Sequence, residues 1–146
     1  MAFTGNWATN TFLVGLLDGT FDFGTGTTQT FNIALYTNAA SLDQNTTAYT
    51  SVGEVVASGY TAGGQALSIS QVPTVGSTGG STAYLSFANS LFNSALTARG
   101  ALIYLANGTT NPAVCVLDFG SDKTSTSTFT VQFPAVTNTS AIIRLS

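Results

Sequence analysis

The sequence predicts a mainly β fold, a single domain over 1–146 built as an antiparallel β-sandwich or barrel of about eight strands with one short N-terminal helix. Three observations lead to this prediction. The length of 146 residues matches one domain. Apolar residues alternate with a period of two in several segments after residue 30, and a single earlier segment has helical spacing. Turns rich in Gly, Asn and Pro separate the segments.

The predicted helix covers about residues 9–18. Thr9 or Asn10 can cap its first turn, and Gly19 is a typical residue for its end. A helix this short has little stability of its own, so its apolar face needs a packing partner. The apolar residues recur at helical spacing: Phe12, Leu13, Leu16 and Leu17.

The remaining elements are predicted strands. Asn107-Gly108 is the strongest hairpin signal between two of them. Alternating segments are typical of half-buried strands: 30–37, 66–72, 81–88 and 128–134. Continuously apolar segments predict strands covered on both faces, inside a sandwich or by a neighbouring subunit: 54–60, 101–106, 113–119 and 141–145.

The chain is poor in charge. It has three Lys or Arg and six Asp or Glu residues, 6% of the sequence, whereas soluble proteins average about 25%. Because nucleic-acid binding relies on clustered Lys and Arg, we expect no nucleic-acid partner. Histidine is absent, which removes the commonest general base and metal ligand. We therefore expect no enzyme activity, no catalytic residue, no metal and no cofactor.

Membrane and secretory signals are also missing from the sequence. The apolar runs are far shorter than the roughly 20 residues of a spanning helix, so we expect no membrane partner. A secretory signal requires a positive charge ahead of an apolar stretch, and the start of the sequence has no such charge. The single cysteine, Cys115, lies in a predicted strand and is expected to be a small buried residue. These features predict a protein that matures inside a cell.

Few charged residues are candidates for a site. Arg99 precedes a strongly apolar strand, and we expect it to form a structural ion pair with Glu54 or Asp118. Tyr60 with Glu54 is the one pairing of an aromatic ring and a carboxylate that suits a carbohydrate. The other carboxylates lie at helix-end, loop or turn positions, which does not favour a catalytic pair.

The glycine-rich segment 59–64 is predicted to be a tight turn between strands. It resembles a phosphate-binding loop only superficially, because Gln65 and Ala66 stand where such a loop has a lysine and a hydroxyl. Gly63 and Gly64 are expected to adopt positive φ angles or to allow a close backbone approach.

The N-terminal arm and helix, 1–18, are expected to contact a neighbouring subunit. Trp7 is either a staple on the domain's own surface or an anchor in a partner. On the helix, Phe12 and Leu16 are the interface candidates. Uncharged strand edges invite pairing with other chains, so the scarcity of charge agrees with an assembling protein.

Several short motifs occur in a fixed order within residues 9–145: Phe21-Asp-Phe23, Ile33-Ala-Leu-Tyr36, Thr46-Thr-Ala-Tyr49, Gly53-Glu-Val55, Gly59-Tyr-Thr-Ala-Gly-Gly64, Thr97-Ala-Arg-Gly-Ala-Leu-Ile-Tyr104, 113–124 and 129–144. This ordered set resembles a family of small virion structural proteins of tailed bacteriophages, notably short-tailed and marine or cyanobacterial phages. The resemblance implies a capsid cement or decoration protein, an intertwined homotrimer that bridges and stabilises subunits of the major capsid protein. It also implies a location on the capsid exterior of the virion after synthesis in the host cytoplasm.

Two other functions stay open. A tail or neck structural component of the virion would differ from a cement protein in its copy number. A carbohydrate-binding β-sandwich on the virion would need an exposed aromatic ring beside a carboxylate, for which Tyr60 and Glu54 are the candidates.

Overall fold

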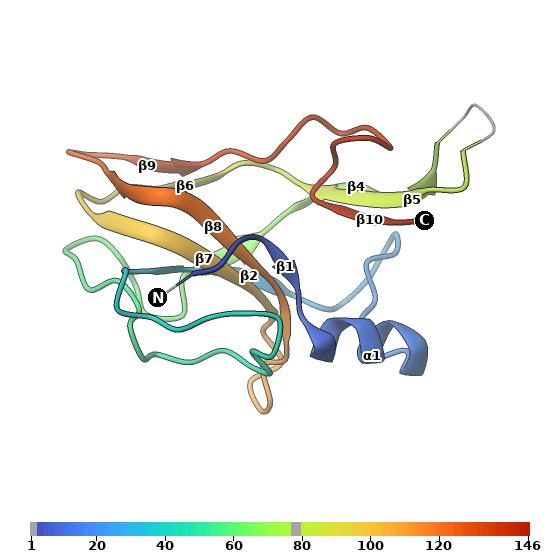
Figure 1. Cartoon of the computed structure of the whole chain (residues 1–146), viewed down its shortest axis with the longest axis horizontal. Helices are drawn as coiled ribbons and strands as arrows, with labels where there is room; N and C mark the ends of the chain where they lie inside the picture. Colours follow the sequence, from blue (N-terminus) through green and yellow to red (C-terminus); the bar gives the residue numbers. More distant parts are fainter. Residues whose placement is uncertain (1–2, 77–79) are drawn as a thin grey trace.

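The computed structural model describes residues 3–76 and 80–146, which form antiparallel sheets with a helix near the N-terminus (Figure 1). The mainly β prediction is confirmed. The described residues contain α1 (Asn10–Asp18) and the strands β1 (Trp7–Ala8), β2 (Phe31–Tyr36), β3 (Gln65–Leu67), β4 (Ile69–Val75), β5 (Ala83–Phe87), β6 (Ser90–Phe92), β7 (Thr97–Leu105), β8 (Ala113–Thr124), β9 (Phe129–Val131) and β10 (Ile143–Leu145).

The main sheet has five strands in the order β1-β8-β7-β2-β3. β2 and β7 pair from Phe31 opposite Leu105 to Tyr36 opposite Gly100. Both faces of the sheet are covered, so the predicted double coverage of 101–106 and 113–119 is largely confirmed. The half-burial predicted for 30–37 is wrong, because Ala34 and Tyr36 pack beneath loops instead of facing solvent.

One face of the main sheet packs against two smaller sheets, β10-β5-β4 and β6-β9. Phenylalanine rings fill the space between these layers. Phe23 stacks on Phe31 with ring centroids 4.3 Å apart, and Phe87 meets Phe133 at 6.0 Å. Such aromatic pairs add to the stability that burial provides. The layers make the fold sandwich-like.

The opposite face of the main sheet is covered by loops. Ala40, Leu42 and Tyr49 come from the long segment between β2 and β3, and Phe3 comes from the N-terminal arm. They pack on the outward side chains of the central strands, including Tyr36. This loop layer carries the polar cluster described below.

α1 begins and ends close to the predicted positions. The Thr9 hydroxyl accepts a hydrogen bond from the Phe12 N–H at 3.1 Å and donates one to the Ala113 carbonyl at 2.8 Å. The first bond caps the helix, and the second fixes it to β8. Gly19 ends the helix in the left-handed conformation, φ +80°, and its N–H donates to the Gly15 carbonyl.

Two of the predicted strands are wrong. Segment 54–60 forms only a bridge between Glu54 and Tyr36, then turns where the Tyr60 N–H donates to the Ala57 carbonyl at 3.1 Å. Its apolar run is not buried as a whole, since Val56 is 97% exposed. Segment 66–72 divides into β3 and β4, which belong to different sheets.

Three other predictions differ in extent. Strand 128–134 shortens to β9. Segment 141–145 is not covered on both faces, because Arg144 and Leu145 are exposed. The Asn107-Gly108 hairpin joins β7 to β8, but its loop is wider than a two-residue turn. Its Asn107 Oδ1 accepts N–H bonds from Thr109, Thr110 and Asn111 at 2.9–3.1 Å.

Candidate functional site

Glu54 is the most unusual polar residue among those described, because it is a charged residue that is only 7% exposed. Three donors hold it. The Tyr49 hydroxyl donates to Oε2 at 2.6 Å, and the Tyr60 hydroxyl donates to Oε1 at 2.7 Å. The Gly63 N–H also donates to Oε1 at 2.7 Å. These charge-assisted bonds offset the cost of burying the carboxylate.

The glycine turn positions these donors. Gly63 and Gly64 have the predicted positive φ angles, +89° and +71°. A Cβ on Gly64 would lie 1.8 Å from the Ile33 carbonyl oxygen, so the turn presses directly against β2. The Tyr104 hydroxyl donates to the Gly63 carbonyl at 2.7 Å. This bond holds Gly63 in place, so that its N–H points to Glu54.

The tyrosines of this cluster keep their protons. Burial, with the charge of Glu54 added, raises the pKa of Tyr36 far above 10. The pKa of Tyr49 and Tyr60 is raised chiefly by burial and also by their hydrogen bonds to Glu54. Burial likewise raises the pKa of Tyr104. We call Glu54 with these four tyrosines the Glu54–tyrosine cluster.

The Glu54–tyrosine cluster is suited to structure. Tyr60 and Glu54 lie together as the carbohydrate hypothesis requires, but they bond to each other, and the Tyr60 hydroxyl also accepts the Leu35 N–H at 2.8 Å. Sequence reasoning missed Tyr36, Tyr49 and Tyr104. The available signal was a lone glutamate in an apolar segment, with tyrosines five residues before it and six residues after it.

Arg99 pairs with Asp118, one of the two predicted partners, and not with Glu54. Its Nη2 lies 3.0 Å from Asp118 Oδ1, and its Nε donates to the same oxygen at 3.1 Å. That oxygen also accepts the Gly120 N–H at 2.8 Å. The pair bridges β7 and β8 where their register shifts, so it holds the two strands together at this irregularity.

The N-terminal candidates fall into different environments. Phe12 is 1% exposed and lies in the core of its own chain, so its assignment as an interface residue is corrected. Leu16 is partly buried against the same core. Trp7 lies in β1 opposite Val116 of β8, and its indole N–H donates to the Thr4 hydroxyl at 3.1 Å. The arm's first two residues, 1–2, lie outside the described residues.

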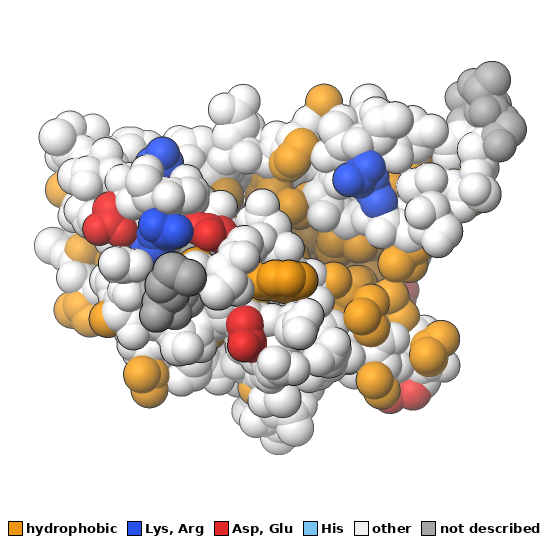
Figure 2. All heavy atoms as spheres, in the orientation of Figure 1, with side chains coloured by type: hydrophobic (Ala, Val, Ile, Leu, Met, Phe, Trp, Pro, Cys, Tyr) orange, Lys and Arg blue, Asp and Glu red, His pale blue; other side chains and the backbone are white. Residues whose placement is uncertain are grey.

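The outer face of α1 is apolar and uncovered, which sequence reasoning did not separate from the inner face. Leu13, Val14 and Leu17 are all exposed, and Leu17 is 92% exposed. Hydrophobic side chains gather over α1 and in the hollow beside it, while charged side chains gather mainly over the other end of this face (Figure 2). We call these three residues the outer helix face.

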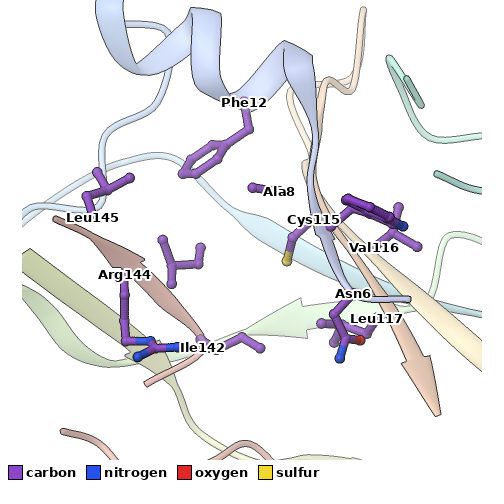
Figure 3. A pocket seen from close by; sticks show the side chains of 11 residues that line it. Asn6, Ala8, Phe12, Cys115, Val116, Leu117, Ile142, Arg144 and Leu145 are labelled. Carbon is purple, nitrogen blue, oxygen red and sulfur yellow. The ribbon is translucent and has the colours of Figure 1, made fainter. Parts of the chain in front are cut away.

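Beside the helix lies a cavity of about 210 Å³ between β1, β8 and β10, which we call the β1–β10 cavity. Phe12 points into it from α1, and the Cys115 thiol lies across from it (Figure 3). Burial raises the pKa of Cys115 to about 12, which keeps it a thiol. Trp7, Leu145 and Arg144 also line the cavity.

Among residues 3–76 and 80–146, no cluster of three or more Cys, Asp or Glu residues could hold a metal ion. Within the same residues, no helix is long and apolar enough to cross a membrane. Comparison with protein-family models, with curated proteins and with solved structures finds no match for this chain.

Proposed function

We propose that this chain is a structural virion protein of a tailed bacteriophage, a capsid cement or decoration protein. In this proposal a homotrimer sits on the outside of the capsid and bridges subunits of the major capsid protein. The ordered motifs within residues 9–145 suggest this class of protein. The structural observation that carries the proposal is a surface with little charge and many exposed large hydrophobic side chains: Trp7, Leu13, Val14, Leu17, Val52, Val56, Val75, Leu91, Val136 and Leu145.

Such a surface is suited to permanent contacts. Stable protein interfaces are larger and more apolar at their centres than transient ones. Exposed aliphatic side chains on an isolated monomer favour association with other copies or other proteins. A protein with three Lys or Arg residues has few contacts that salt could screen.

Cement function requires several simultaneous contacts with the shell. A trimer that touches several capsid subunits at once is released only when all contacts break together. Each contact can then be weak while the shell is held firmly against internal pressure. Within each subunit, the partly buried Arg99–Asp118 ion pair and the Glu54–tyrosine cluster fix strands and loops in place, which lowers the entropic cost of ordering them on binding.

Purified virions test the proposal by the copy number of the chain, measured by quantitative mass spectrometry against the major capsid protein. A cement protein is expected in numbers that scale with the capsomers of the shell and to stay bound in molar salt. A copy number equal to one ring would indicate the tail or neck. Absence from virions, or binding to a glycan array without capsid binding, would overturn the proposal.

A further inference from the structure

The outer helix face and the β1–β10 cavity lie next to each other at one end of the molecule. Phe12 and the outer residues belong to the same nine-residue helix, and Phe12 forms part of the cavity wall (Figure 3). The outer helix face is therefore a convex apolar surface, and the β1–β10 cavity is a concave one. A cavity of about 150 Å³ can take up benzene, so one of about 210 Å³ has room for a single large aliphatic side chain.

Charge at this end is complementary between the two surfaces. Arg144 lines the cavity and is exposed, and its Nη1 donates only to the Thr139 carbonyl, at 2.6 Å. Asp18 follows Leu17 at the end of α1 and is exposed, bonding to the Thr20 N–H and hydroxyl. Among the described residues, Arg99 and Asp118 form the one ion pair, so Arg144 and Asp18 each lack an oppositely charged side chain.

We propose that the outer helix face of one copy docks on the β1–β10 cavity of a second copy of this chain. Leu17 then enters the cavity, and Asp18 lies beside Arg144 of the next subunit. Because the two surfaces differ, the contact is head-to-tail. A ring closes when the outer helix face of every copy docks on the cavity of the next copy. This inference rests on the proposed function for the expected ring size of three.

A second copy explains this pair of surfaces better than an unrelated partner. Both the apolar projection and its receptor are present on one chain, and so are both members of the charge pair. Trp7 at the cavity rim is the type of residue that dominates binding energy in protein interfaces. The helix also gains the second packing partner that its outer apolar face lacks.

Charge reversal tests the docking directly. The full chain and three variants, Asp18→Arg, Arg144→Asp and the combined Asp18→Arg/Arg144→Asp, are compared by sedimentation velocity over a range of concentrations. Each single reversal is expected to lose the trimer, and the combined variant is expected to regain it. Each reversal also removes hydrogen bonds, to Thr20 or to Thr139, so circular dichroism must show that every variant is folded. Recovery of the trimer in the combined variant then assigns the loss of assembly to the charge pair.

A second set of variants tests the apolar contact between the outer helix face and the cavity. Val14→Ser/Leu17→Ser is expected to be a folded monomer by circular dichroism, whereas Val56→Ser and Leu91→Ser, exposed aliphatic residues outside the helix, are expected to remain trimers. The docking is overturned if Val14→Ser/Leu17→Ser stays trimeric, or if the full chain is a monomer and these changes abolish capsid binding instead. The proposed function fails separately, through absence of the chain from virions.

Discussion

Two regions of this molecule are opposites: one buries a charged side chain, and the other exposes apolar ones. Beneath the loops on one face of the main sheet, the Glu54 carboxylate is buried with three donors satisfied inside the chain. At the α1 end, Leu17 and Val14 face solvent, and none of the described residues covers them. The polar groups of the first region are satisfied within the chain, whereas the apolar side chains of the second are left exposed. The first region therefore stabilises the fold, and the second is the surface that we propose for docking.

Alkaline pH is expected to have the largest effect, through the Glu54–tyrosine cluster. Burial and the nearby carboxylate raise the pKa of Tyr36, Tyr49, Tyr60 and Tyr104 above their ordinary value of 10 in the folded chain. Above pH 10 the unfolded chain therefore releases protons that the folded chain retains, and the free energy of unfolding falls. The loss is at most about 1.4 kcal/mol per pH unit for Tyr36 and smaller for partly exposed Tyr49.

An alkaline titration of a Tyr84→Phe variant, in which the four tyrosines of the cluster are the only ones left, measures this effect by tyrosinate absorbance and circular dichroism. The two signals are expected to change together at a pH well above 10, because these tyrosines ionise as the sheet unfolds. Stability below pH 10 is expected to be independent of these groups. Tyrosinate formation near pH 10 with an unchanged β-sheet spectrum would contradict the buried cluster.

The two faces of α1 are expected to differ next most strongly. Phe12→Ala removes a ring from the core and should lower the free energy of unfolding by about 3–5 kcal/mol. Leu17→Ser alters an exposed side chain and should change it by less than about 0.5 kcal/mol in the monomer. Urea denaturation at concentrations that favour the monomer measures both values. Equal effects would mean that the outer helix face is packed within its own chain.

Glu54→Ala should cost about 3 kcal/mol. The change leaves the hydroxyls of Tyr49 and Tyr60 and the Gly63 N–H without their acceptor, and unsatisfied buried donors cost about 1–3 kcal/mol each, less where water can reach them. Glu54→Gln keeps an acceptor oxygen and should cost about 1 kcal/mol. Asp122→Ala, an exposed carboxylate, is the matched control and should be near neutral. A Glu54→Ala variant as stable as the control would disprove the structural role.

Gly64→Ala is expected to have a smaller but specific effect, about 2 kcal/mol or more. The added Cβ meets the Ile33 carbonyl oxygen at a backbone with φ +71°. Gly108→Ala shares the positive φ, +74°, but its Cβ would meet nothing within 4 Å, so it should cost about 1 kcal/mol. The difference between the two thermal midpoints isolates the close approach of the turn to β2, and equal midpoints would argue against it.

Local patterns predicted the parts of the fold that depend on neighbours in sequence. Thr9 and Gly19 bound the helix as expected. The sequence left two partners for Arg99, Glu54 and Asp118, and only the fold decides for Asp118. The strand predicted at 54–60 is wrong because hydrophobic pattern does not reveal that Glu54 is an internal acceptor and that Val56 faces solvent. Those features depend on which loops fold over the second face of the main sheet.

The candidate site was predicted less completely for a related reason. Tyr49 and Tyr104 are 55 positions apart in numbering, yet their rings stack with centroids 4.9 Å apart. Neither position has a local signal for this contact. The helical pattern likewise placed Phe12 and Leu17 together on one apolar helix. Only the fold shows that Phe12 is buried and Leu17 is exposed.

A reconstruction of the intact virion would show directly where this chain lies on the particle. We predict density for trimers of this chain on the outer surface of the capsid, with the α1 ends of three copies meeting around each threefold axis. Density for the chain in the tail or neck, or no density on the particle, would contradict its role as a capsid cement protein.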